Sequence, residues 1–159
     1  MLPLKEILIF LGVFTFFFQI PDQFTAKVIG ISDGDTLTVL VDKTQIKIRV
    51  DGIDCPEKKQ AFGNKAKEFT SDFCFGKVVT VKKNKMDRYG RLVARVIYNG
   101  KDLSEELLKA GMAWHFKKYD KSPVLNNLEV EARHKRVGLW SDPNPIAPWC
   151  FRKPEKCVQ

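Results

Sequence analysis

The sequence predicts an α+β domain built on a small antiparallel β-barrel. Strand-like segments come first along the chain and helical segments follow, an order typical of this class. Over residues 46–50 apolar and basic residues alternate with the two-residue period of a half-buried strand. Apolar segments at 27–31, 36–41, 78–82 and 92–98 predict four further strands. With 159 residues and 44% hydrophobic content, the chain suits a single domain with one core.

Three helices are expected after the first strands. Aromatic and small residues at helical spacing over 62–73 predict the first helix. The Asp-Leu-Ser-Glu sequence at 102–105 offers a capping box for a second helix that runs to Gly111. A third helix is expected from Pro123 to Gly138. The predicted element order is therefore β-β-β-α-β-β-α-α.

The two ends of the chain differ from the middle. Residues 7–20 carry no charge, yet they are fewer than the roughly 20 residues that span a bilayer. We interpret 1–26 as a signal peptide or an N-terminal membrane anchor, with the domain at 27–141 exported to the periplasm or medium, or anchored outside the cytoplasm. Residues 142–159 contain four prolines and are expected to form an irregular C-terminal arm.

The charge and the cysteines narrow the possible partners. The formal net charge is +8, which favours a polyanionic partner such as nucleic acid or an anionic membrane surface. The cysteines show no CxxC spacing and no nearby histidine, so a zinc site is not expected. Cys150 and Cys157 are the most plausible disulfide, closing a short tail, and Cys74 is expected to be buried.

Acidic residues and arginines recur at the ends of predicted strands. They are Asp35, Arg49, Asp54, Glu57 and Arg91. Taken singly, each could be a turn residue or half of a weak surface salt bridge. Together they suit phosphate chemistry, because carboxylates bind hard cations such as Ca²⁺ and a guanidinium matches phosphate oxygens. A carboxylate that binds no metal could then activate a water molecule.

Three short motifs, in this order, resemble those of the thermonuclease, or staphylococcal nuclease-like, family. They are DGDT (33–36), RVDGIDCPE (49–57) and DRYGR (87–91), followed by NGKDLSEELLKAGMAW (99–114) and GLW (138–140). The resemblance covers roughly residues 26–140. It implies an OB-fold-type five-stranded antiparallel β-barrel with three helices.

The resemblance also implies a calcium site at the tip of the first hairpin. Asp35 and Asp54 would supply carboxylates to Ca²⁺, and Cys55 would supply its backbone carbonyl. Asp33 would lie near the ion without binding it directly. Gly34, between the two aspartates, is expected to make the turn because glycine adopts positive φ at little cost.

Catalytic and substrate-binding roles follow from the same resemblance. Glu57 would be the general base that deprotonates the attacking water. Arg49 and Arg91 would bind the scissile phosphate and stabilise the charge that develops on it. The positions that match nucleotide contacts of the family are Arg88, Tyr89 and Tyr119.

The implied activity is calcium-dependent, sugar-nonspecific endonucleolytic hydrolysis of DNA and RNA to 3′-phosphate ends. Single-stranded or locally open substrates are expected, because aromatic residues beside a basic groove stack bases without regard to sequence. One alternative is a catalytically inactive nucleic-acid-binding module on the same fold. Another is a basic adaptor tethered to the membrane through residues 7–20, which would not explain the five charged residues.

The chain departs from the family pattern in three places. The segment between Glu57 and the first helix is shorter than in the founding member, and an aromatic residue expected near Lys117 is missing. Cys55 replaces a common threonine, which should matter little if only its carbonyl binds metal.

Overall fold

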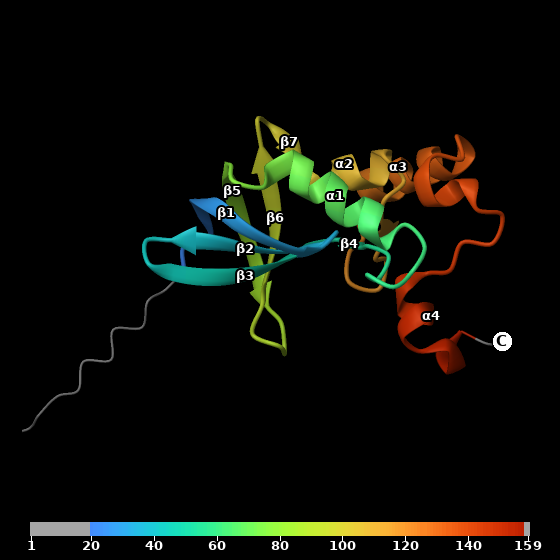
Figure 1. The fold of residues 1–159 in the computed structure, drawn as a ribbon, viewed down its shortest axis with the longest axis horizontal. Coiled ribbons are helices and arrows are strands. Elements are labelled where there is room, and N and C mark those ends of the chain that lie inside the picture. Colours follow the sequence, from blue (N-terminus) through green and yellow to red (C-terminus); the bar gives the residue numbers. More distant parts are fainter. Residues whose placement is uncertain (1–19, 158–159) are drawn as a thin grey trace, which may run out of the picture.

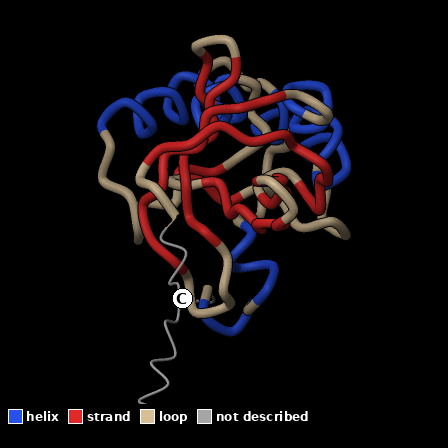
Figure 2. The backbone as a smooth tube through the Cα atoms, turned by 90° about the vertical axis from the view of Figure 1, so that its left-hand side faces the viewer, coloured by secondary structure: helices blue, strands red, loops and turns tan. Residues whose placement is uncertain are grey.

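The computed structural model describes residues 20–157 and shows a closed β-barrel with helices packed against it (Figure 1). Figure 2 shows the strands wrapping around the core. The barrel strands are β1 (Gln23–Asp33), β2 (Thr36–Val41), β3 (Thr44–Val50), β5 (Val78–Met86) and β6 (Leu92–Tyr98). They pair antiparallel in the order β3-β2-β1-β5-β6, and a parallel pairing of β3 with β6 closes the barrel. The predicted fold class is thus confirmed.

Three helices cover one side of the barrel, as expected. They are α1 (Gly63–Cys74), α2 (Leu103–Lys109) and α3 (Pro123–His134). The carboxylate of Asp102 accepts a hydrogen bond from the Ser104 amide and caps α2, as the capping sequence predicts. The third helix ends four residues before the predicted stop, because Arg136 adopts a left-handed conformation with a φ of 53°.

Gly138 does not end a helix, and it lies at a close contact between two segments that are distant in the sequence. It opens the 3-10 helix η1 (Gly138–Ser141) with a φ of +58° and lies against Gly111, whose φ is +65°. A Cβ on either glycine would lie 2.2 Å from a backbone oxygen across this contact. No side chain fits there, so the two backbones meet directly.

Short strands complete the fold. They are β4 (Ile53–Asp54), β7 (Lys101–Asp102) and β8 (Trp114–His115). β7 extends the main sheet beyond β6, and β4 and β8 form a separate two-stranded ribbon. Two residues are too few to show a periodic pattern, so the sequence did not predict them. The ribbon matters because β4 carries one of the candidate metal ligands.

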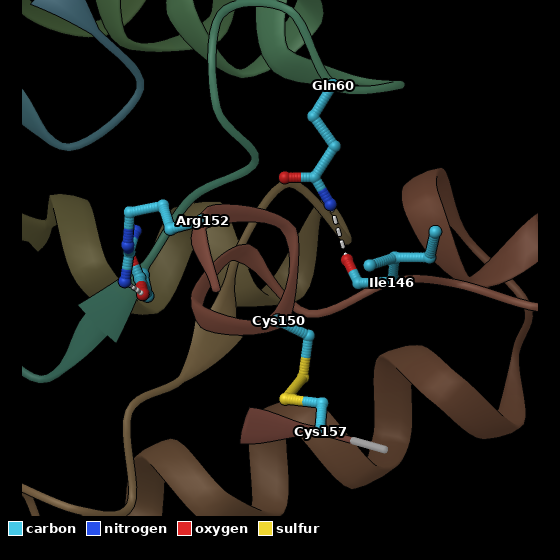
Figure 3. The surroundings of a disulfide bond; sticks show 6 residues. Gln60, Ile146, Cys150, Arg152 and Cys157 are labelled. Atoms are coloured by element: carbon cyan, nitrogen blue, oxygen red, sulfur yellow. Dashed lines mark hydrogen bonds and ion pairs between the residues drawn. A yellow bond between two sulfur atoms is a disulfide. The ribbon is translucent and has the colours of Figure 1, made fainter. Parts of the chain in front are cut away.

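The C-terminal arm (residues 142–157) is not irregular throughout, which corrects the sequence interpretation. It forms a short helix α4 (Pro148–Arg152) and a 3-10 turn η2 (Pro154–Lys156). Proline at the first helical position suits α4, since its missing amide hydrogen would have no partner there. Cys150 and Cys157 form the predicted disulfide (Figure 3). In Figure 1 the arm descends from the end of the helical layer to α4, which lies beyond the β4 end of the barrel, and Ala147 of the arm packs in one buried cluster with Ala132 of α3.

The barrel begins earlier than the expected boundary after residue 26. Strand β1 starts at Gln23, and Ala26 is only 4% exposed and pairs with Val79 of β5. Residues 23–26 therefore belong to the folded domain. Most of the apolar segment at 7–20 lies outside the described residues. No helix within residues 20–157 is long and apolar enough to cross a membrane.

Candidate active site and nucleic-acid interface

The first hairpin places Asp35 at the mouth of β2. The Asp33 carboxylate accepts a hydrogen bond from the Asp35 amide at 3.1 Å and supports the turn. Gly34 has no positive φ, which corrects the expected reason for the glycine. Space explains it instead: a Cβ there would lie 2.7 Å from the Cβ of Ala66 and 2.9 Å from the Sγ of Cys55. The close approach of α1 therefore requires glycine.

Arg49 joins the two predicted metal carboxylates. Its Nη1 lies 3.1 Å from Oδ2 of Asp35 and its Nη2 lies 3.0 Å from Oδ1 of Asp54. Asp35 immediately precedes β2 and Asp54 belongs to β4, and both are almost fully buried. Arg49 also donates to the Val50 carbonyl at 3.0 Å, which fixes the plane of its guanidinium. The structure thus brings these three predicted residues together.

The pKa of Asp35 reflects this crowded, buried position. Burial raises it from 3.8 to about 7, against the lowering effect of Arg49, while Asp33 and Asp54 raise it further. The Cys55 amide donates to Oδ2 of Asp35 at 2.6 Å and favours the ionised form. Asp35 shares the guanidinium of Arg49 with Asp54 and has no second cationic partner among the described residues, so additional positive charge would stabilise its ionised form.

This donor set fits a hard divalent cation. Within residues 20–157 no three His, Cys, Asp or Glu side chains are grouped to hold a metal ion. Two carboxylates do converge, and Ca²⁺ also accepts backbone carbonyls and water as ligands. Asp35 and Asp54 could therefore hold Ca²⁺ with the Cys55 carbonyl and water, and the predicted metal roles of the three residues remain predictions.

The Cys55 thiol is poorly suited to bind a metal ion. Burial, with the neighbouring Asp35 carboxylate, raises its pKa well above 9.0, so it stays neutral near pH 7. We expect Cys55→Ser to keep calcium-dependent cleavage within about threefold of wild type and to lower unfolding free energy by about 1–2 kcal/mol. Cleavage assays and thermal unfolding would test this. A large loss of calcium affinity would instead implicate the sulfur.

Glu57 contacts this cluster through a residue that the sequence analysis did not single out. Arg152 of the C-terminal arm places Nη1 2.6 Å from Oε1 of Glu57 and Nη2 2.7 Å from Oδ2 of Asp54. Arg152 donates hydrogen bonds to Asp54 and to Glu57. Both bonds raise the pKa of Arg152 above its ordinary value, and the bond to Asp54 has the larger effect. Glu57 itself remains partly exposed, as a group that activates water must be.

Arg91 does not join the cluster. Its Nε lies 2.7 Å from Oδ2 of Asp87, in the turn between β5 and β6. Among the described residues, no hydrogen bond or ion pair links Arg91 to Asp35, Asp54 or Glu57. Its guanidinium instead lies 5.5 Å from the ring centre of Tyr89. The predicted role of Arg91 in binding the scissile phosphate stays a prediction.

A groove of about 760 Å³ runs beside the cluster, and the predicted nucleotide-contact residues Arg88, Tyr89 and Tyr119 all line it. The rings of Tyr89 and Tyr119 are largely exposed. Seven of its lining residues are basic and one, Glu129, is acidic. Glu129 is already paired with Arg133 at 2.8 Å. We call this the basic groove.

Arg152 and Trp149 are the site residues that sequence reasoning missed. One signal was present: the predicted disulfide encloses Arg152, Lys153 and Lys156, three bases in a short closed loop. The sequence did not show where that loop lies. Trp149 stacks on Phe116 with ring centres 5.4 Å apart and planes 3° apart. An aromatic from the arm thus stacks on Phe116, the residue before Lys117, near which an aromatic was expected.

Arg49→Lys tests whether the guanidinium shape matters. A lysine would keep the charge, but one ammonium cannot bridge Asp35 and Asp54 and also offer a fork to phosphate. We expect cleavage to slow by on the order of 100-fold. Initial rates with a fluorescent oligonucleotide would measure this, with circular dichroism to verify folding. A rate close to wild type would show that charge alone suffices.

Comparison with known proteins agrees with the motifs and the fold. Residues 47–142 match the family described as "Staphylococcal nuclease homologue". A Haemophilus influenzae protein named "Uncharacterized endonuclease" is 44% identical over 133 residues, which is 83% of this chain and 75% of the relative. The "Micrococcal nuclease" of Shigella flexneri is 38% identical over 145 residues, covering 84% and 83% of the two chains. The chain therefore belongs to the staphylococcal nuclease family.

Proposed function

We propose that this protein is a calcium-dependent, sugar-nonspecific endonuclease that hydrolyses DNA and RNA to 3′-phosphate products. The observation that carries the proposal is that Arg49 joins Asp35 and Asp54 in one cluster. Arg152 links Glu57 to the same cluster, because it pairs with both Glu57 and Asp54. An inactive binding module would have no need for two buried carboxylates and a partly exposed glutamate at one point. The basic groove beside them offers a path for the polyanionic substrate.

In the proposed mechanism each side chain has a separate task. Asp35, Asp54 and the Cys55 carbonyl would hold Ca²⁺, which when bound would neutralise charge on the scissile phosphate. Glu57 accepts a proton from the attacking water, whose oxygen bonds to phosphorus while the P–O5′ bond breaks; the 5′-oxygen leaves with a proton from solvent, and the phosphate stays on the 3′-oxygen. Arg49 binds phosphate oxygens and stabilises the charge that grows as the phosphorus becomes five-coordinate. Arg91, from the turn between β5 and β6, also binds the scissile phosphate, for which its ion pair with Asp87 must break.

Single-stranded or locally open nucleic acid is the proposed preferred substrate. The exposed rings of Tyr89 and Tyr119 can stack on bases of any identity, and the surrounding bases follow the phosphate backbone. All the proposed catalytic contacts address phosphate, so little sequence preference is expected.

The decisive experiment is cleavage by purified full-length protein. Single-stranded DNA, duplex DNA and RNA are each incubated with calcium or with a chelator, and the product ends are identified by sensitivity to a 3′-phosphatase. We expect cleavage only with calcium, on all three substrates, with 3′-phosphate ends. Cleavage in chelator, or none in calcium, would overturn the proposed mechanism.

We also propose that the protein is exported, or anchored with its domain outside the cytoplasm. The uncharged segment at 7–20 and the Cys150–Cys157 disulfide support this, because disulfides persist in oxidising compartments. Cell fractionation and mass spectrometry of the mature N-terminus would test the proposal. A cytoplasmic protein with reduced cysteines would contradict it.

A further inference from the structure

The C-terminal arm is attached firmly to the domain. Ala147 and Pro148 are buried, and Trp149 packs against the rings of Trp114 and Phe116. Upstream of α4, the side-chain amide of Gln60 donates to the carbonyl of Ile146 (Figure 3). Aromatic packing and a hydrogen bond thus hold the arm beside the site.

The arm directs one arginine at the candidate catalytic residues. Figure 3 shows the Arg152 side chain extending from α4 away from the disulfide. Its guanidinium forms ion pairs with Asp54 and Glu57, yet the side chain remains 40% exposed. An arginine that is open to solvent beside the reacting site can also contact an arriving phosphate.

The charge of the arm continues into the basic groove. Lys153 and Lys156 line the groove on the arm side, and other lining bases include Arg88, from the turn between β5 and β6, and Lys118, from the segment between β8 and α3. Neither lysine of the arm has an ion pair among the described residues. Both are exposed, so they are free to bind a flexible anionic chain.

We propose that the disulfide-closed arm is a wall of the substrate-binding groove, with Arg152 binding the phosphate next to the scissile one and Lys153 and Lys156 binding phosphates further along. The occupant is a single nucleic-acid strand. The Cys150–Cys157 bridge closes a short loop that contains all three bases, and all three line the basic groove. The inference rests on the proposed function and extends it to the substrate path.

Binding without cleavage tests the arm directly. The full-length protein is titrated in chelator with a fluorescent oligothymidine of about 12 nucleotides, a length within the range of single-strand binding sites. Affinity is measured at several salt concentrations. Because each lost phosphate contact lowers the salt slope by roughly 0.7 on single strands, Lys153→Gln/Lys156→Gln should lower it by roughly 1.4.

A matched control removes the same charge elsewhere. Lys43 and Lys101 are exposed and lie outside the basic groove, in the β2–β3 hairpin and in β7. Lys43→Gln/Lys101→Gln should leave the salt slope unchanged. An equal decrease in both double variants would mean that only net charge matters, and would overturn the inference.

Arg152→Ala and a variant without the disulfide extend the test. Arg152→Ala should weaken oligonucleotide binding about tenfold and raise KM in calcium. Cys150→Ser/Cys157→Ser should weaken binding similarly while circular dichroism shows an intact barrel. Faster cleavage by Arg152→Ala at unchanged affinity would make the arm an inhibitory lid and overturn the proposal.

The two proposals can fail separately. If the protein binds with an arm-dependent salt slope but does not cleave in calcium, the nuclease proposal fails and the arm remains a binding surface. If it cleaves and the arm variants bind and cleave like wild type, only the arm proposal fails.

Discussion

Asp35→Asn should abolish calcium-dependent cleavage, with a loss of at least about 100-fold. The carboxylate is buried at the mouth of β2 and shares Arg49 with Asp54. An amide has no negative charge to offer a hard cation, although its oxygen could still accept the Cys55 amide. The turn should therefore survive while the calcium affinity is lost. Cleavage rates and thermal unfolding with and without calcium would measure both.

Asp33→Asn is the matched control for that experiment. Asp33 lies two residues away and supports the turn through the Asp35 amide, which an asparagine oxygen can also do. We expect only weakened cleavage. In wild type and in Asp33→Asn, calcium at 100 times its Kd should raise Tm by roughly 5–10 °C. The same shift in Asp35→Asn would show that Asp35 does not bind the ion.

Glu57→Gln should depress kcat by about 100- to 10,000-fold with little change in substrate binding. Glutamine keeps the size of the side chain and can still accept the hydrogen bond from Arg152, but it cannot take a proton from water. Single-turnover cleavage in calcium gives the chemical rate. Oligonucleotide binding in chelator gives the affinity.

Glu68→Gln removes an equivalent charge from an exposed position on α1. It should cleave at the wild-type rate. If Glu57→Gln does so too, Glu57 is not the general base, and another group must activate the water.

Local patterns predicted the regular elements well. The alternation over 46–50 lies within β3, and the segment at 92–98 coincides with β6. Asp102 caps α2 because its side chain reaches a nearby amide, an interaction that short spacing alone determines. The strand β4 was missed because two residues carry no period, although it presents Asp54. Motif order, not periodicity, placed Asp54 in the site.

Long-range contacts lie outside what such patterns encode. Arg152 and Asp54 are 98 residues apart, and their contact depends on the path of the whole arm. The disulfide was predicted from cysteine spacing, but the spacing says nothing of which face of the barrel the loop meets. The family motifs ended at residue 140, before the arm. Arg152 thus reaches the site although it lies outside every motif. Arg91 lies inside a motif, yet its side chain pairs with Asp87 and not with Asp54.

The contact of Gly111 with Gly138 gives the arm a fixed point of origin. Arg152 gives it a fixed destination at Asp54 and Glu57. Because the segment is held at both ends, its length determines where the Arg152 side chain lies relative to Asp54 and Glu57. A residue inserted or deleted between 142 and 147 would therefore shift Arg152 relative to Asp54 and Glu57 without changing Arg152 or either of its partners. Loop length in this protein thus becomes a determinant of the site, alongside the identity of its side chains.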